Sequence, residues 1–148
     1  MSILPTMNIS LDDITDTINA NQLSTSSTST LSEFKEYAWD FNKNDFLLVD
    51  GKFVIVEGKE ALKIWIWKAL HTLRQRYKIY SDKYGSDLDT LIGKGYSVGM
   101  IESEGKRLVE NCLLQNQHIF GIENFTVTKL ETDTFNISCT VVTDSGEV

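Results

Sequence analysis

GKEALKIWIWKALHTLRQRYKIYSDKYGSDLDTLIG, residues 58–93, has the strongest structural pattern in the chain. It predicts an apolar helix over about 59–74, a basic connector, a Tyr-Gly turn and a second short helix. The first helix carries a main apolar stripe and a second, partly apolar stripe on its opposite side. A helix that is apolar on two sides needs cover on both. The main stripe is Leu62, Trp65, Ile66, Ala69, Leu70 and Leu73, and the second is Ile64, Trp67 and His71.

Two explanations for the second stripe remain open: this domain's own strands cover it, or another protein does. Charge bears on the choice. The net charge is −7, yet residues 51–83 carry eight Lys and Arg against three acids. This basic segment is either an interaction surface or a solvated helix face. The acidic total argues against a nucleic-acid partner.

Composition predicts one soluble domain. The chain has 148 residues, of which 41% are hydrophobic and 10% aromatic, enough for a real core. No apolar run approaches the ~20 residues of a membrane span, and the N-terminus lacks the pattern of a secretory signal. Cys112 and Cys139 fall on predicted core faces, so we expect reduced, buried thiols and synthesis in a cytoplasm.

The chain divides into two parts. Residues 1–35 include a Ser/Thr-rich run and are predicted to form a flexible N-terminal arm. Residues 36–148 are predicted to fold as one α+β domain, with a small antiparallel sheet packed with about three helices. Asp50-Gly51 between two apolar runs indicates a hairpin, because both turn residues need positive φ. Further helices are expected at about 87–92 and 98–115.

The C-terminal part is predicted to be a β-hairpin. Its strands are 122–128 and 134–143, with turn residues 131–133. The outward side chains of the second strand carry no charge to discourage pairing with another chain. Strand addition by a partner is therefore expected at this edge. Residues expected to face inward are Phe135, Ile137, Cys139 and Val141, and those expected to face outward are Asn136, Ser138 and Thr140.

No catalytic, cofactor or metal site is predicted. Glu102 and Glu104, two apart on a helix, point about 200° apart and cannot flank a sugar. His71 and His118 lack acids or cysteines at ligand spacing. The other acids fit helix starts and turns.

Several motifs across residues 36–145 resemble a family of baseplate proteins from contractile tails of Gram-positive phages, defective prophages and R-type bacteriocins. That family is related to the sheath-initiator, or tail-lysozyme-like, wedge protein. The motifs are Trp39-Asp40-Phe41, Asp50-Gly51-Lys52, Gly58-Lys59-Glu60-Ala61-Leu62, Ile66-Trp67-Lys68-Ala69-Leu70, Arg76-Tyr77, Tyr80-Ser81, Tyr84-Gly85 and Leu91-Ile92-Gly93.

The resemblance implies a structural, non-enzymatic subunit, with six copies in the baseplate of a phage tail or phage-tail-like bacteriocin made in the bacterial cytoplasm. The C-terminal hairpin would give the first ring of tail sheath protein a template for strand pairing. The helical side and the N-terminal arm would dock on baseplate wedge proteins (baseplate-J-like and its partner) and on hub or tube-initiator proteins.

Particular residues are expected to make the contacts with wedge, hub and sheath proteins. The wider family often carries a Gly-Glu-Arg type motif before the aromatic-Gly turn, and this chain lacks it, so Arg74, Arg76 and Lys78 are the candidates for a comparable basic contact. The full wedge- and hub-binding set is Ile64, Trp67, His71, Arg74, Arg76 and Lys78; the sheath-binding set is Phe135, Asn136, Ser138, Thr140 and Val142.

Two other functions remain open from the sequence. One is a lysozyme-like cell-wall glycoside hydrolase, and the other is a small adaptor domain unrelated to tails that binds one partner through the basic helix. Cell-wall lysis would support the first, and a partner unrelated to any tail component would support the second.

Overall fold

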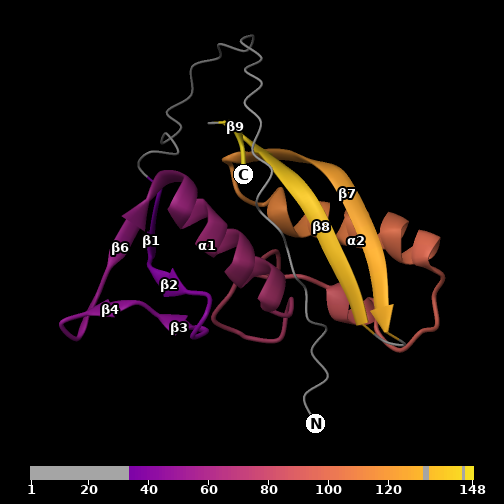
Figure 1. Ribbon diagram of the computed structural model, residues 1–148, viewed down its shortest axis with the longest axis horizontal. Helices are drawn as coiled ribbons and strands as arrows, with labels where there is room; N and C mark the ends of the chain where they lie inside the picture. Colours follow the sequence, from indigo (N-terminus) through magenta and orange to yellow (C-terminus); the bar gives the residue numbers. More distant parts are fainter. Residues whose placement is uncertain (1–33, 132–133, 145) are drawn as a thin grey trace.

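The structure is a computed structural model that describes residues 34–131, 134–144 and 146–148. The predicted arm, residues 1–35, lies almost entirely outside the described residues, as do two of the three predicted turn residues, 132–133. The α+β class is confirmed (Figure 1). The described part contains helices α1 (Gly58–His71) and α2 (Val98–Leu113) and the 3₁₀ helix η2 (Leu88–Leu91).

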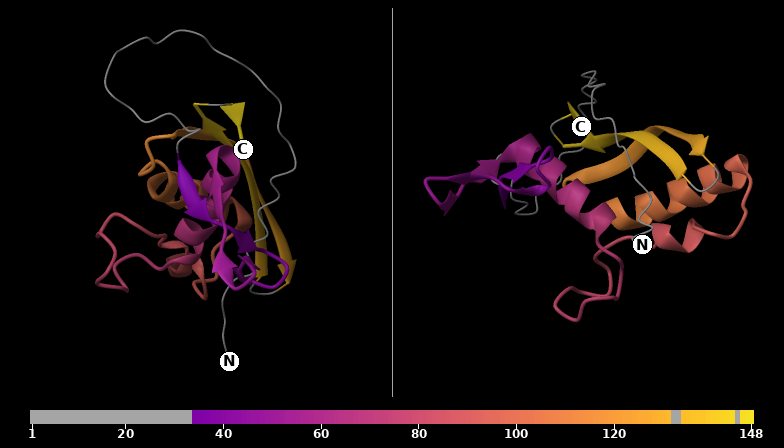
Figure 2. Two further views of the ribbon diagram at one scale, coloured as in Figure 1. Left: turned by 90° about the vertical axis from the view of Figure 1, so that its left-hand side faces the viewer. Right: turned by 60° about the horizontal axis from the view of Figure 1, so that its bottom comes forward.

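Residues 35–57 form a narrow antiparallel ribbon, called the ribbon below, that projects from the rest of the molecule (Figures 1 and 2). The hairpin predicted at Asp50-Gly51 is confirmed, with φ values of 52° and 73°. In the ribbon β1 pairs with β6, β2 with β3, and β4 with β5. The strands are β1 (Lys35–Tyr37), β2 (Trp39–Asp40), β3 (Asp45–Phe46), β4 (Leu48–Val49), β5 (Lys52–Phe53) and β6 (Ile55–Glu57).

Helix α1 ends at His71, three residues before the predicted end at 74. Long-range pairing explains the difference. The Ser86 N–H donates to the Thr72 carbonyl at 2.8 Å, and the Arg74 N–H donates to the Ser86 carbonyl at 3.1 Å. These bonds hold Thr72 in an extended conformation, which ends the helix.

Helix α2 packs against a three-stranded antiparallel sheet in the order β7–β8–β9. Ser97 caps α2, because its hydroxyl accepts the Met100 N–H at 3.4 Å. The predicted second strand, 134–143, is confirmed to the residue, whereas the first is longer than predicted. The strands are β7 (Ile119–Glu131), β8 (Thr134–Thr143) and β9 (Gly146–Glu147).

The core lies between α1, α2 and the β7–β8 hairpin (Figure 1). Leu62 and Ile66 reach it from α1, and Val109 and Leu113 reach it from α2. Cys112 and Cys139 are both buried and free, as the sequence predicted. The second face of α1 packs against the ribbon and not against this core.

Candidate interaction surfaces

The second stripe of α1 is covered in part by this chain's own ribbon, and its last residue, His71, is exposed. Ile64 is buried, with 4% of its surface exposed. The Trp67 ring stacks on His71 with centroids 4.4 Å apart and lies 4.8 Å from the Trp39 ring of β2. Ile64 therefore offers no surface to a partner, and Trp67 is half-buried within the domain. The wedge-binding prediction for Ile64 stays untested, but its burial argues against a direct contact; helical periodicity cannot tell which strands will cover a helix.

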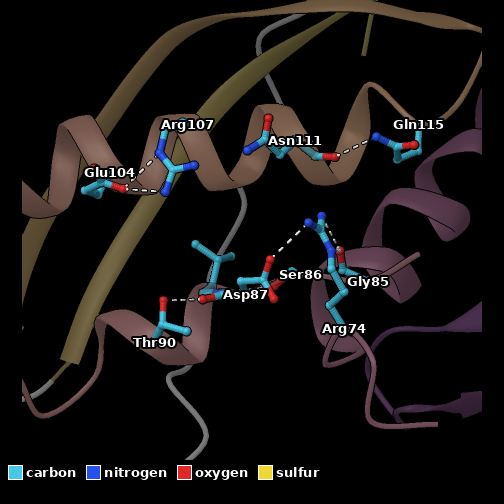
Figure 3. A network of polar contacts seen from close by, with 10 residues as sticks. Arg74, Gly85, Ser86, Asp87, Thr90, Glu104, Arg107, Asn111 and Gln115 are labelled. Atoms are coloured by element: carbon cyan, nitrogen blue, oxygen red, sulfur yellow. Dashed lines mark hydrogen bonds and ion pairs between the residues drawn. The ribbon is translucent and has the colours of Figure 1, made fainter. Parts of the chain in front are cut away.

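Arg74 is likewise engaged within the chain. Figure 3 shows its guanidinium beside Gly85 and Asp87, in the segment that precedes η2. It donates to the Gly85 carbonyl at 3.3 and 3.1 Å, and it pairs with the Asp87 carboxylate at 3.0 Å. Arg74 therefore ties the connector to the end of α1.

The connector between α1 and η2 projects into solvent as a loop (Figure 2). Residues 75–83, called the basic loop below, are all exposed, including Arg76 and Lys78. Ile79 is 87% exposed, and the half-exposed rings of Tyr77 and Tyr80 lie beside it, 6.3 Å apart. Apolar side chains beside exposed cations at a loop tip are typical of an interaction surface.

A larger exposed apolar surface, which the sequence pattern did not predict, lies on the ribbon. Register places Tyr37 opposite Ile55 and Leu48 opposite Phe53, so their side chains share one face. Phe46 joins that face through ring contacts with Tyr37 and Phe53. All five are exposed. The alternation in the sequence indicated half-buried strands, but it could not show that this face lacks cover within the described residues. We call these five residues the aromatic face.

The predicted sheath-binding residues all lie on β8. Four of them are half-buried: Phe135, Asn136, Ser138 and Val142. Thr140 was expected to face outward, but it is buried, with 7% exposed. It pairs with Glu123, next to a register shift in β7. A bulge bends and twists the ladder locally, so strict alternation of buried and exposed faces fails there.

The outer edge of β8 is regular, and most of it is unpaired within the described part of the chain. The Val141 N–H and C=O bond to Val148, on the side away from β7. Alternate residues of a strand direct their backbone groups to the same side, so Phe135, Ile137 and Cys139 direct theirs outward too. Among the described residues, strand pairing on this side is found only for residues 141–143. We call Phe135, Ile137 and Cys139 the free edge of β8.

The β7 strand contrasts with β8, because every register shift between them adds a residue on the β7 side. From Glu123 to Thr126 the chain advances three residues while its partner advances two, from Thr140 to Ser138. The shifts at 119–121 and 129–131 have the same sense. Bulges protect strand edges against pairing with other chains. Of the hairpin's two edges, β8 is therefore the one suited to accept a strand.

Burial also keeps this edge free of thiolate charge. Desolvation raises the pKa of Cys139 to about 11. The same cause raises the pKa of Cys112 to about 12, against the opposing effect of the nearby Arg74 cation. Both side chains are therefore neutral thiols at neutral pH, and neither is an activated nucleophile.

Three of the acids considered for hydrolysis are either paired with a cation or exposed. Glu104 pairs with Arg107 at 2.8 Å, and Glu57 pairs with Lys35 at 2.6 Å. Glu102 lies exposed on α2. Within the described part of the chain there is no cluster of three His, Cys, Asp or Glu side chains able to hold a metal ion.

A regular, uncharged strand edge and an exposed aromatic ribbon on a small α+β domain are typical of proteins that work in assemblies. Comparison with known families makes this class specific. Residues 35–146 match the profile of the contractile injection system sheath initiator, and the chain belongs to this family. Proteins of this family are structural components of contractile injection systems.

The chain is also similar to a protein of a Gram-positive prophage. The phage-like element PBSX protein XkdS of Bacillus subtilis (strain 168) is 32% identical over 93 residues. The alignment covers 62% of this chain and 65% of XkdS, slightly less than two thirds of that relative's length. None of the helices in the described part of the chain is long and apolar enough to span a bilayer.

Proposed function

We propose that this protein is a non-enzymatic baseplate subunit that joins the wedge and hub to the first sheath ring and templates sheath assembly by strand pairing. The particle is a phage tail or a phage-tail-like bacteriocin. Sixfold tail symmetry gives six copies, made in the bacterial cytoplasm and incorporated into the baseplate.

The free edge of β8 carries this proposal. Phe135, Ile137 and Cys139 present backbone donors and acceptors in a regular array. An added strand gains main-chain hydrogen bonds there without disturbing the β7–β8 ladder. The β7 edge, interrupted by bulges, is a poorer acceptor.

The baseplate contact is assigned to the aromatic face and the basic loop. The partners are the wedge proteins (baseplate-J-like and its partner) and the hub or tube-initiator proteins. This assignment replaces the α1 stripe, because Ile64 is buried and Arg74 is engaged at Asp87. Arg76 and Lys78 remain as exposed cations of the contact, and His71 and Trp67 lie at its border.

A proline substitution tests the strand pairing. Phe135→Pro removes an outward N–H from the free edge but leaves the β7–β8 bonds in place, because proline is compatible with the outer side of an edge strand. Phe135→Leu is the matched control, since it keeps the N–H and an apolar side chain. Baseplates carrying Phe135→Pro are expected to bind sheath protein at least tenfold more weakly and to appear without extended sheath by electron microscopy.

Folding of both variants is checked by circular dichroism. Phe135→Leu should assemble normal sheath. If Phe135→Pro is folded, incorporates into baseplates and supports full-length sheath, template pairing at this edge is excluded.

A further inference from the structure

Residues 146–148 of the same chain occupy one end of the β8 edge. The Val148 N–H donates to the Val141 carbonyl at 2.8 Å, and the Val141 N–H donates to the Val148 carbonyl at 2.9 Å. Strand β9 continues the pairing, with Glu147 opposite Val142 and Gly146 opposite Thr143. Residues 141–143 are therefore already paired on the side where a partner strand would add.

Val148 anchors this C-terminal strand in the core. Its side chain is 1% exposed and belongs to the same hydrophobic cluster as Val141. A strand as short as β9 stays in place only where further contacts tie it down. Here two backbone bonds and a buried side chain hold it.

The turn before β9 has a second anchor at His118, the residue that precedes β7. The His118 ring Nδ1 lies 2.9 Å from the Asp144 carboxylate, and the Asp144 N–H donates to the His118 carbonyl at 3.3 Å. His118 is 2% exposed, and the Phe34 ring meets it edge-on at 5.6 Å. The turn is thus fastened to buried groups on the far side of the hairpin, and β9 is held at both of its ends.

From this arrangement we infer that β9 is a fixed stop that sets the register of the incoming sheath strand; the inference rests on the proposed function. The strand pairs with the free edge, Phe135 to Cys139, and ends against Val148. Five residues of β8 span about 17 Å, so the sheath segment pairs over about five to six residues. A stop matters because a strand that slips by one residue turns every side chain to the wrong face.

The partner's chemistry follows from the edge. The neighbouring side chains on the core side are Phe135, Ile137 and Cys139, and those on the other side include Asn136 and Ser138. The matching segment is a short, uncharged strand that alternates apolar and small polar side chains.

Amide hydrogen exchange on the full-length protein, free and bound to purified sheath protein, tests the stop. Exchange is quenched and located by mass spectrometry with residue-level fragmentation. Sheath binding is expected to slow exchange at Ile137 and Cys139 at least tenfold. The amides of Val141 and Val148 should be equally protected with and without sheath, because β9 supplies their bonds in both states.

Two outcomes would overturn the inference, and they are distinguishable. If Ile137 and Cys139 become protected while the Val148 amide becomes labile, the sheath strand displaces β9. The stop is then wrong and the proposed function stands. If sheath binds without protecting Ile137 or Cys139, strand pairing at this edge and the stop both fail.

A variant gives a second, independent readout. Val148→Pro keeps an apolar side chain but removes the N–H that donates to the Val141 carbonyl. The bond from the Val141 N–H to the Val148 carbonyl then stands alone, so β9 should open more often. The free variant should therefore show at least tenfold faster exchange at Val141, and sheath binding should then protect residues beyond Cys139. Exposed Gly99→Ala on α2 is the matched control and should leave both patterns unchanged. Protection that still ends at Cys139 in a folded Val148→Pro would show that β9 does not set the register.

Discussion

Gly85 shows how one residue joins two distant parts of the chain. Its φ is +102°, and a Cβ there would lie 2.7 Å from the Thr72 carbonyl oxygen. The close approach follows from the backbone bonds between Ser86 and the Thr72–Arg74 segment. The Gly85 carbonyl also accepts from Arg74, so this residue fixes both the end of α1 and the base of the basic loop (Figure 3).

Gly85→Ala is therefore expected to lower the free energy of unfolding by about 3 kcal/mol, because backbone must move and the positive φ is strained. Gly99→Ala is the matched control. Gly99 lies in the first turn of α2, where an added Cβ would meet no atom of another element within 4 Å, so alanine should be neutral or stabilise by about 0.5 kcal/mol. Urea denaturation measures both. Equal effects of the two substitutions would contradict the close contact at Gly85.

The buried thiols predict a pH dependence of stability. Folding raises the pKa of Cys112 to about 12 and of Cys139 to about 11, above the unfolded value of about 8.5. Their contribution is complete below about pH 8.5 and is lost as pH rises toward the folded pKa values. Between about pH 9 and 10 the free energy of unfolding should fall by up to about 1.4 kcal/mol per pH unit for each thiol.

Denaturation of the double variant Cys112→Ala/Cys139→Ala over the same pH range is the control, and its slope should be markedly smaller. Tyr84, whose pKa burial raises to about 12, adds its own dependence only above about pH 10. An unchanged slope in the double variant would show that thiol burial does not govern alkaline stability.

Among the helices and strands, the sequence pattern predicted those features that depend on residues close together in the chain. The Asp50-Gly51 turn and the bounds of β8 follow from turn chemistry and from alternation of inward and outward residues. The end of α1 at His71 did not follow, because it depends on backbone bonds to Ser86, which is fifteen residues further along the chain. Helical periodicity contains no information about distant backbone groups that compete for the bonds of the last helical turn.

The candidate surfaces divide in the same way. The sequence predicted an uncharged C-terminal edge. It could not show which residues of β8 direct their backbone N–H and C=O groups away from β7, because that is known only from the pairing of Val141 with Val148. Thr140 was misplaced because a bulge in β7 is not visible in β8. The aromatic face was missed because its residues have the composition of core strands. Whether such strands find cover depends on the whole fold and, in an assembly protein, on the partner.

At the scale of the whole molecule, the two proposed contacts lie on different substructures. The ribbon extends from one side of α1, whereas the β7–β8 hairpin lies against α2 on the other side (Figures 1 and 2). A subunit that connects baseplate to sheath needs this separation, because both partners must bind at once. The arrangement predicts that each contact can be removed without the other.

The double variant Tyr37→Ser/Phe53→Ser removes two rings from the aromatic face. Both side chains are at least half exposed, so the loss of folding stability should be about 1 kcal/mol. This variant is expected to be depleted at least tenfold from purified baseplates while keeping its affinity for sheath protein in solution. Phe135→Pro should show the reverse, with normal incorporation and weakened sheath binding. Quantitative mass spectrometry of baseplates and a sheath pull-down measure the two properties, and loss of both in either folded variant would contradict separate contacts.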